Sequence, residues 1–208
     1  MRRTTTQHTK FWQTRLIDWQ KDYFSPEMIN HPHRLLLIEK LHQFRFKTLL
    51  EVGCAAGANL ALVQRYFPHV QIGGVDISAE AIAQARKNFP HAYFDVASAD
   101  KMFFSDYSLD VIMTDMTLIY LGGKAVKKAL ADFKRTAGVA VVLVEFYHPS
   151  WWKRFTLWLR SGYFAHDYKT LLEGLGYYDI EMTKIPEPYW PNGEPQKTYA
   201  YIITARIP

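Results

Sequence analysis

Short apolar runs alternate with amphipathic segments through the middle of the chain. The runs are strand-sized, and the segments between them carry apolar residues at the spacing of one helix face, as Leu60, Val63 and Phe67 do. Strands that alternate with helices predict a parallel sheet with right-handed crossovers. The pattern predicts strands at 48–52, 71–77, 92–96, 109–113 and 139–146, and helices at 58–67, 79–89 and 124–137.

The segment ahead of this alternation is predicted to be helical. Residues 10–24 form a loosely amphipathic helix that Ser25-Pro26 breaks, and a second helix follows the sequence His31-Pro32-His33. Two histidines around a proline are a possible metal-binding pair. Because no third ligand is near in sequence, a loop that starts a helix is the favoured interpretation.

The last quarter of the chain follows a different pattern. Residues 148–164 are aromatic and basic, and a helix is predicted at 167–175. Two strands, at 177–185 and 198–207, are then joined by a proline-rich connection that includes Pro191 and Asn192. Consecutive strands with no helix between them pair antiparallel, so the chain is expected to end in a β-hairpin.

The turn between the first strand and its helix is the main candidate for ligand binding. It contains Gly53, Ala55 and Gly57, and no bulky side chain occurs before Asn59. Such a turn leaves backbone N–H groups exposed at a helix N-terminus and lets a ligand approach the backbone closely. The next strand ends in Asp76, nineteen residues after Gly57, where an acid can accept hydrogen bonds from a ribose diol.

The glycine spacing distinguishes two families of cofactor. A nicotinamide fingerprint needs glycines at positions one, three and six, and counted from Gly53 only one of the three is present. The pattern acid-x-Gly-x-Gly-x-Gly is matched at three of four positions, by Glu51, Gly53 and Gly57, with Ala55 at the remaining one. This stretch resembles motif I of the class I S-adenosylmethionine-dependent methyltransferases.

That resemblance extends over roughly residues 34–207 and implies the fold. It is an α/β, Rossmann-like, seven-stranded and mostly parallel sheet with helices on both faces and a C-terminal antiparallel β-hairpin. One domain would span residues 1–208. Its parts would be an N-terminal helical extension or lid (1–33), a cofactor-binding core (34–147), an acceptor-side insertion (148–164), and the C-terminal helix and hairpin (165–208).

The same resemblance implies S-adenosyl-L-methionine as the cofactor and S-adenosyl-L-homocysteine as its product. Segment 99–111 is similar to the family's third block, in which Ala99 and Asp100 would contact the adenine. Glu51 would meet the amino group of the cofactor, and Arg34 and Tyr23 its carboxylate. The expected cofactor-binding residues are Tyr23, Arg34, Glu51, Gly53, Ala55, Gly57, Asn59, Asp76, Ile77, Ala99, Asp100 and Asp115.

Methyl transfer from a sulfonium is a direct displacement, so a base is needed only when the acceptor must lose a proton. The catalytic candidates beyond the strand ends are Asp115, Tyr120 and His148, and no metal is expected. The segment after the fourth strand lacks the Asn/Asp-Pro-Pro-Tyr/Phe motif, which disfavours adenine and glutamine as acceptors. No cysteine lies in the later strands, which argues against cytosine-C5 chemistry.

The composition of the chain indicates the number of domains, the cellular compartment and the class of partner. A chain of 208 residues suits one domain, and the single Cys54 excludes a disulfide framework and suits a reducing compartment, so we expect a cytoplasmic protein. No apolar run reaches membrane-spanning length. The net charge of +5 leaves open a non-catalytic or RNA-associated module, although a small-molecule acceptor is favoured over nucleic acid. The sequence does not indicate an oligomeric state.

The aromatic segment 148–164 gives a further hypothesis. It starts on the carboxyl side of a central strand, where an acceptor has to lie, and it contains Trp151, Trp152 and several basic residues. Long connections are usually functional or structured on their own. We therefore predict a helical or mobile lid over the acceptor pocket, with burial of these tryptophans in the core as the alternative.

Overall fold

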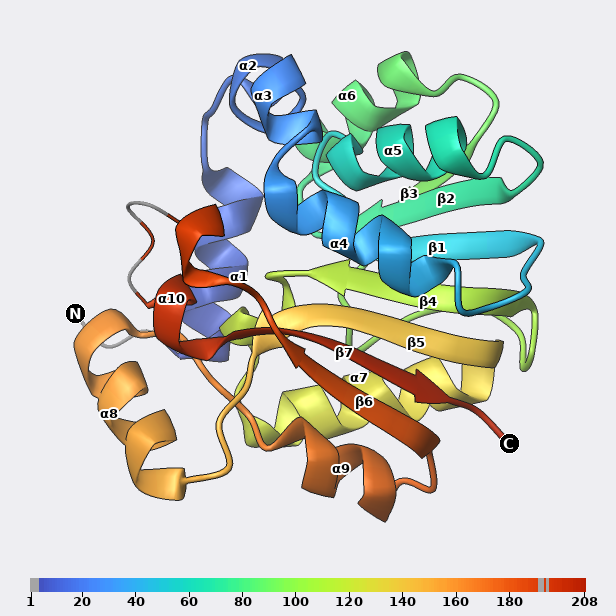
Figure 1. Cartoon of the computed structure of the whole chain (residues 1–208). Helices are drawn as coiled ribbons and strands as arrows, with labels where there is room; N and C mark the ends of the chain where they lie inside the picture. Colours follow the sequence, from blue (N-terminus) through green and yellow to red (C-terminus); the bar gives the residue numbers. More distant parts are fainter. Residues whose placement is uncertain (1–3, 191–192, 194) are drawn as a thin grey trace.

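The structure is a computed structural model that describes residues 4–190, 193 and 195–208. A seven-stranded sheet with the order β3-β2-β1-β4-β5-β7-β6 runs through its centre (Figure 1). The strands are β1 (Thr48–Val52), β2 (Gln71–Asp76), β3 (Tyr93–Val96), β4 (Leu109–Asp115), β5 (Ala137–Phe146), β6 (Tyr178–Lys184) and β7 (Ala200–Arg206).

The pairing of the strands confirms the predicted topology. Strands β1 to β5 are parallel, whereas β7 pairs antiparallel with both β5 and β6. Val52, at the end of β1, pairs with Val75 of β2 and Thr114 of β4. The carboxyl ends of these three strands therefore lie at one edge of the sheet, where open α/β sheets bind ligands.

Helices cover both faces of the sheet because its central strands alternate apolar side chains between two cores. Leu49 packs with apolar residues of α4 (Pro32–Leu41), α5 (Ala58–Tyr66) and α6 (Ala79–Asn88). Its neighbour Leu50 packs on the opposite face with those of α7 (Gly123–Thr136) and α9 (Tyr168–Gly174). Ser78 caps α6 through a hydrogen bond from the backbone of Ala81, as its sequence position predicts.

The N-terminal segment departs from the prediction of one helix over 10–24. It forms α1 (Thr5–Thr14), α2 (Trp19–Tyr23) and α3 (Pro26–Ile29). A capping box of Thr4 and Gln7 starts α1 earlier than expected, and the backbone turns extended at Arg15. Asp18 then caps α2 by accepting a hydrogen bond from the Lys21 N–H, so the local capping residues divide the segment in two.

The C-terminal quarter contains the helix predicted as one possibility for segment 148–164, which is α8 (Trp151–Ser161). The connection between β6 and β7 contains helix that the sequence pattern does not indicate, η2 (Glu187–Tyr189) and α10 (Gln196–Tyr199). The antiparallel pairing of β6 and β7 is confirmed. Pro191 and Asn192 lie outside the described residues. Within the described part of the chain, no helix has the length and apolarity needed to cross a bilayer.

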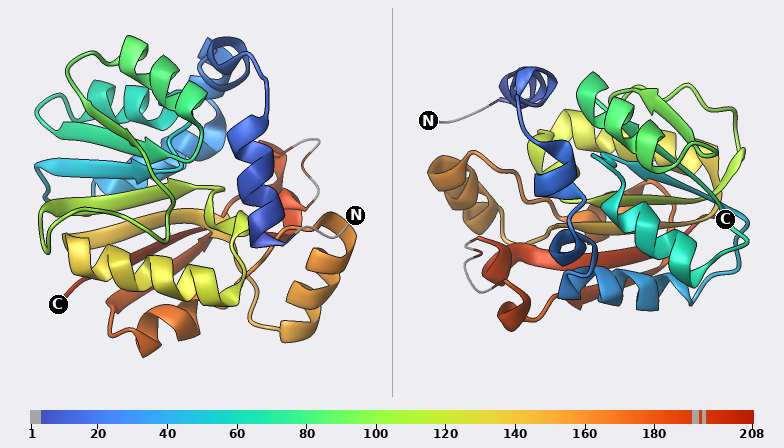
Figure 2. Two further views of the ribbon diagram at one scale, coloured as in Figure 1. Left: turned by 180° about the vertical axis from the view of Figure 1, so that it is seen from behind. Right: turned by 90° about the horizontal axis from the view of Figure 1, so that it is seen from above.

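Helix α1 lies at the edge of the sheet that is formed by the carboxyl ends of the parallel strands. Figures 1 and 2 show this helix lying across the edge at which the parallel strands end, far in sequence from most of the strands that it faces. Two hydrogen bonds attach it there. The Gly122 N–H donates to Thr5 Oγ1 at 2.9 Å, and His8 Nε2 lies 2.9 Å from the carbonyl oxygen of Gly162.

Candidate active site

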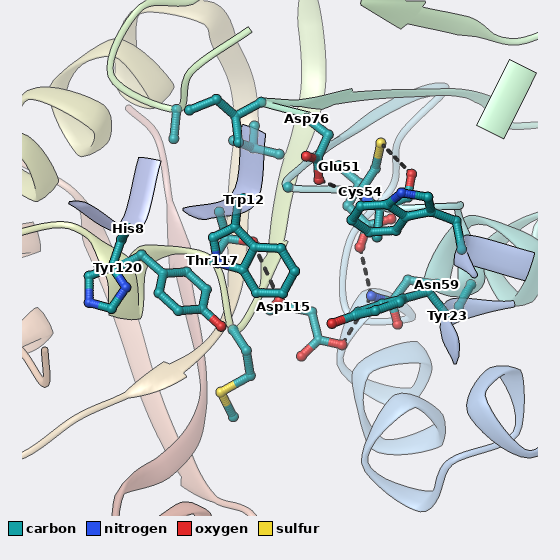
Figure 3. Close-up of a pocket in the computed structure, with 18 of the residues that line it drawn as sticks. His8, Trp12, Tyr23, Glu51, Cys54, Asn59, Asp76, Asp115, Thr117 and Tyr120 are labelled. Carbon is teal, nitrogen blue, oxygen red and sulfur yellow. Dashed lines mark hydrogen bonds between the residues drawn. The ribbon is translucent and has the colours of Figure 1, made fainter. Parts of the chain in front are cut away.

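A cavity of about 450 Å³ lies at the carboxyl ends of β1, β2 and β4 (Figure 3). Three parts of the chain line it: the segments that follow these strands, the N-terminal helices, and the connection that precedes β7. Trp12 of α1 sits between Tyr120 and Tyr23, with ring centroids 5.5 and 6.3 Å away. The cavity is therefore enclosed partly by aromatic surface and partly by the turns of the sheet.

The turn after β1 is held by Asp76. One oxygen of this carboxylate accepts a hydrogen bond from the Ala55 N–H and the other from the Ser78 N–H, both at 2.9 Å. Gly53 and Ala55 line the cavity and have positive φ angles of 79° and 49°. A Cβ atom on Gly53 would lie 2.0 Å from Thr117 Oγ1, so only glycine fits at this position. Burial raises the pKa of Asp76, while its backbone hydrogen bonds act in the opposite direction.

A network of polar side chains lies beside this turn. Asn59 Nδ2 donates to Glu51 Oε1 at 2.6 Å and to Asp115 Oδ2 at 3.1 Å, and Arg34 Nε donates to Asn59 Oδ1 at 2.8 Å. Glu51 Oε2 is buried and has no hydrogen-bond partner among the described residues. Burial raises the pKa of Glu51 to about 8, against the effect of the Asn59 hydrogen bond. A half-satisfied buried carboxyl group of this kind favours a positively charged ligand group.

Asp115 belongs to the same network and is held in its ionised form. Its Oδ2 lies 2.9 Å from His33 Nε2 and 3.6 Å from Arg34 Nε. Although burial acts in the opposite direction, His33, Arg34 and the Asn59 hydrogen bond keep the pKa of Asp115 well below its ordinary value. The guanidinium of Arg34 is fixed in turn by a hydrogen bond to the Met28 carbonyl. Asp115 faces the cavity as predicted, but its depressed pKa makes it a poor proton acceptor for an external group.

Tyr120 also lines the cavity, yet its phenol is unsuited to act as a base. Burial raises its pKa far above the ordinary value, so it keeps its proton. Its ring packs on His8 at 5.1 Å between centroids. Tyr120 therefore offers the cavity a hydroxyl group and an aromatic face.

His148, a predicted catalytic candidate, lies outside the described lining of the cavity. Its Nδ1 accepts a hydrogen bond from the Ser150 N–H at 3.0 Å, just ahead of α8, and its ring packs on Tyr199. His148 follows β5, but the chain turns away from the cavity immediately after that strand, which the sequence pattern does not reveal.

Gly57 and Asp100, both predicted for cofactor binding, lie outside the described lining residues. Gly57 caps α5 with φ of 93°, and a Cβ atom there would lie 2.6 Å from the ring of Phe89, so its missing side chain serves packing. Asp100 accepts a hydrogen bond from Ser98 Oγ at 2.6 Å and is not among the described lining residues. The adjacent Ser98 and Ala99 do line the cavity, as do the other residues predicted for cofactor binding, which are Tyr23, Arg34, Glu51, Gly53, Ala55, Asn59, Asp76, Ile77 and Asp115.

Several lining residues have no counterpart in the sequence prediction. Trp12 and Trp19 come from the N-terminal helices, His31 and His33 from the start of α4, and Trp190 from the connection after β6. The Nε1 atoms of all three tryptophans are buried without a hydrogen-bond partner among the described residues. Buried donors are normally satisfied, so these atoms indicate room for a polar ligand. The concentration of aromatic residues before Ser25 is the only sequence signal for this wall.

The segment proposed as a lid adopts the predicted helical conformation but has a different place. None of the described lining residues belongs to α8, and Trp151 and Trp152 are 66% and 56% exposed. Their exposure also excludes the alternative in which both tryptophans pack in the core. The N-terminal helices, which belong to the other segment expected to form a lid (1–33), supply His8, Trp12, Trp19 and Tyr23 to the lining.

Among the residues that the structure describes, no group of three or more histidine, cysteine, aspartate or glutamate side chains is arranged to hold a metal ion. His31 and His33 do start a helix, as predicted: His31 is the N-cap of α4 and Pro32 its first residue. The two rings nevertheless face the cavity.

Residues 49–137 match the model of a family described as a methyltransferase domain. A protein from Haemophilus influenzae without an assigned function is 31% identical over 96 residues, and nodulation protein S from Rhizobium tropici is 36% identical over 107 residues. These segments make up 43% and 50% of this chain, but only 38% and 43% of the two relatives. A trans-aconitate 2-methyltransferase from Afipia carboxidovorans is 31% identical over 58 residues, which are 28% of this chain and 23% of that protein.

Solved structures share the fold over nearly the whole chain. A geranyl diphosphate C-methyltransferase from Streptomyces coelicolor A3(2), crystallised with Mg²⁺, geranyl diphosphate and S-adenosyl-L-homocysteine, superposes with a TM-score of 0.70. The match covers 97% of both chains at 14% identity. A geranyl diphosphate methyltransferase in complex with sinefungin gives 0.65 at 16% identity, over 84% of this chain and 76% of that one. Identities this low establish the common fold alone.

Proposed function

We propose that this protein transfers a methyl group from S-adenosylmethionine to a small-molecule acceptor, on the premise of the methyltransferase-domain match over residues 49–137 and of the shared fold. The family match and the fold support the reaction class. The segments shared with the curated relatives cover less than half of those proteins, so the activity of the whole protein rests on the site itself.

The residues present fit this cofactor. Asp76 is a half-buried carboxylate that lines the cavity at the end of β2, where a ribose diol can donate to it. Glu51 and its network would hold the amino group of the methionine portion, and Ser98 and Ala99 would lie against the adenine. When bound, the cofactor supplies a methyl group on a positively charged sulfur.

One observation carries the proposal: the unpartnered Oε2 of Glu51 lies in the same cavity as the Asp76 carboxylate. A buried carboxyl oxygen without a donor costs free energy unless a ligand supplies that donor. An ammonium group does so. Each oxygen of Asp76 already accepts one backbone hydrogen bond and has a further lone pair for a ribose hydroxyl. The two acids therefore match the two polar ends of an aminoacyl nucleoside such as S-adenosylmethionine.

The dimensions and lining of the cavity support a small acceptor. Its volume of about 450 Å³ is within the range of small-molecule sites, and indole and phenol rings form one wall. Geranyl diphosphate and trans-aconitate, named for two of the related proteins, are also small molecules.

The alternative of an RNA-associated module has less support. It depends on basic surface residues, and several of these are engaged within the chain. Lys134 Nζ donates to the Leu175 carbonyl at 2.8 Å, Arg135 pairs with Asp106 and Asp132, and Arg154 lies 3.9 Å from Asp167. Charges neutralised in this way contribute little to phosphate binding. The cytoplasmic location expected from the single cysteine stays a prediction.

Two measurements test the proposal. Calorimetry with S-adenosylhomocysteine is expected to show one site per chain, and S-adenosylmethionine with an isotope-labelled methyl group is expected to label small molecules in a metabolite extract. Total RNA offered in parallel should remain unlabelled. Absence of S-adenosylhomocysteine binding would overturn the proposal, and label in the RNA fraction would favour the alternative acceptor class.

A further inference from the structure

Three side chains form a continuous hydrogen-bonded line that ends in the cavity. His31 Nδ1 lies 2.6 Å from His33 Nδ1, and His33 Nε2 lies 2.9 Å from Asp115 Oδ2. His33 and Asp115 are buried, with 4% and 7% of their side chains exposed, whereas His31 is half-buried and lines the cavity. Trp190 packs on both imidazoles, with centroid distances of 4.9 and 4.6 Å, and fixes their planes.

The chemistry of these groups sets the position of each proton. An ionised carboxylate only accepts hydrogen bonds, so His33 Nε2 must donate to Asp115. In a neutral His33 the other nitrogen, Nδ1, is then an acceptor, and the proton shared at 2.6 Å belongs to His31 Nδ1. His31 Nε2 is left with a free lone pair, and among the described residues nothing donates to it.

We propose that His31 is the catalytic base of this protein, and that His33 and Asp115 are positioning residues that complete a proton relay behind it. This inference rests on the methyltransferase function proposed above and names a property of the acceptor. The acceptor has to be a group that gives up a proton, such as a hydroxyl, an ammonium or an acidic carbon. A carboxylate needs no base and does not require this arrangement.

The transfer balances in atoms and charge. An electron pair on the acceptor atom, which in an ammonium or an acidic carbon is freed as its proton leaves, forms the new bond to the methyl carbon, and the bond from that carbon to sulfur breaks with its electron pair left on sulfur. The acceptor's proton passes to His31 Nε2, while the proton on His31 Nδ1 passes to His33 Nδ1. The positive charge that was on the sulfonium is therefore found on the His33 imidazolium, next to the Asp115 carboxylate.

The surroundings explain why the charge moves on to His33. Burial, together with the neighbouring His33 and Arg34, lowers the pKa of His31 to about 4, and Asp115 offsets this only in part. His31 alone is therefore a poor place to leave a proton at neutral pH. The Asp115 carboxylate lies 2.9 Å from His33 Nε2, so the counter-charge for an imidazolium stands next to His33. Arg34 on α4 and Asp115 at the end of β4 are the charged groups that face the pair.

The protonation states of the two histidines can be measured by spectroscopy without a bound acceptor. Histidine-selective ¹⁵N NMR on the ligand-free protein should find His31 protonated on Nδ1 and His33 on Nε2 at high pH. On acidification, one coupled step should move the proton of His31 to Nε2 while His33 becomes an imidazolium. The inference is overturned if His31 carries its proton on Nε2 at high pH, or if His31 itself becomes the imidazolium in that first step.

Variants connect the signature to turnover. His31→Gln should leave S-adenosylhomocysteine affinity within about threefold, yet reduce label transfer to the metabolite extract by at least about a hundredfold. His42→Gln is the matched control, because His42 is exposed at the other end of α4. Full label transfer by His31→Gln would overturn the relay while leaving the methyltransferase function intact. If the unmodified protein does not bind S-adenosylhomocysteine, the proposed methyltransferase function itself is refuted.

Discussion

The carboxylate of Asp76 accepts a hydrogen bond from the backbone N–H of Ala55 at 2.9 Å. The acid at the end of β2 thus fixes the glycine turn at the end of β1, in addition to facing the cavity. Ala55 has a φ of 49°, a conformation that costs about 1–2 kcal/mol for a residue with a side chain. The hydrogen bond from Asp76 helps the turn to keep that conformation without a ligand.

Asp76→Ala is expected to weaken S-adenosylhomocysteine binding by at least about tenfold, since each charge-assisted hydrogen bond contributes about 1.5–3 kcal/mol. The same change leaves the Ala55 and Ser78 N–H groups without their acceptor, so the free energy of unfolding should fall by roughly 1–3 kcal/mol. Calorimetry and urea denaturation separate the two effects. Asp95→Ala, on the exposed edge strand β3, is the control. If Asp76→Ala binds S-adenosylhomocysteine with unchanged affinity, Asp76 stabilises the turn but does not contact the ligand.

Gly57→Ala is expected to destabilise the fold and to spare the cavity. The positive φ and the contact with Phe89 should together cost about 1–3 kcal/mol. Phe89→Leu removes the ring atom that a new Cβ would meet, so a double-mutant cycle should give a coupling energy of at least about 0.5 kcal/mol. Gly123→Ala, where a Cβ meets nothing within 4 Å, is the control. A Gly57→Ala protein that is as stable as the original but no longer binds S-adenosylhomocysteine would show that the glycine serves the ligand.

Binding of S-adenosylhomocysteine should release a proton from Glu51. Its pKa of about 8 keeps most of the carboxyl group protonated at pH 7, and an ammonium group placed against it favours the ionised form. Calorimetry in two buffers of different ionisation enthalpy should detect about one proton released per ligand at pH 7. In Glu51→Gln the release should fall close to zero. Equal proton release by both proteins would assign the titration to another group.

The same carboxyl group makes the ligand-free protein lose stability as the pH rises. Its folded pKa of about 8 lies above its ordinary value of 4.5, so the folded state binds more protons between those values. The stabilisation is complete below pH 4.5 and is lost as the pH approaches 8, by at most about 1.4 kcal/mol per unit. Urea denaturation at pH 5.5 and 7.5 should show a smaller loss in Glu51→Gln than in the unmodified protein. Identical losses would contradict the raised pKa.

The tryptophans of α8 and α1 are expected to behave in opposite ways. Trp151 and Trp152 are exposed and lie outside the cavity, so replacing both with alanine should leave Tm and S-adenosylhomocysteine affinity nearly unchanged. Trp12→Ala removes a ring that packs on Trp19, Tyr23 and Tyr120, and both quantities should decrease. Thermal melts and calorimetry on the two proteins test this contrast. A large Tm decrease in the α8 variant would mean that these side chains have a packing role.

The sheet and the turns could be predicted because their signals are local. Strand-sized apolar runs, the cap at Ser78 and the spacing of Glu51, Gly53 and Gly57 are all read within a few residues. The strand order and the antiparallel end then follow from general connection rules and the family resemblance. For this reason most of the residues predicted from the turns do line the cavity.

The rest of the site depends on contacts between distant residues. His33 and Asp115 are 82 positions apart, and the roof of the cavity comes from residues before β1 together with Trp190. A pair of histidines around a proline is typical of a helix start, and His33 also reaches Asp115 only because α4 packs on the sheet. Sequence spacing carries no information on that approach. The positions of His148 and Gly57 outside the described lining have the same origin, since the direction of a loop and of one Cβ atom are tertiary properties.

The aromatic wall also gives the protein its own optical probe. Three of its six tryptophans, Trp12, Trp19 and Trp190, line the cavity with their indole nitrogens buried and unpaired among the described residues. Indole emission shifts in wavelength and intensity with the polarity of its surroundings, so these three residues should respond when a molecule enters. Trp151 and Trp152 face solvent and contribute a constant background at longer wavelengths. Intrinsic fluorescence can therefore be used to screen candidate acceptors directly, without any label on the protein or the compound.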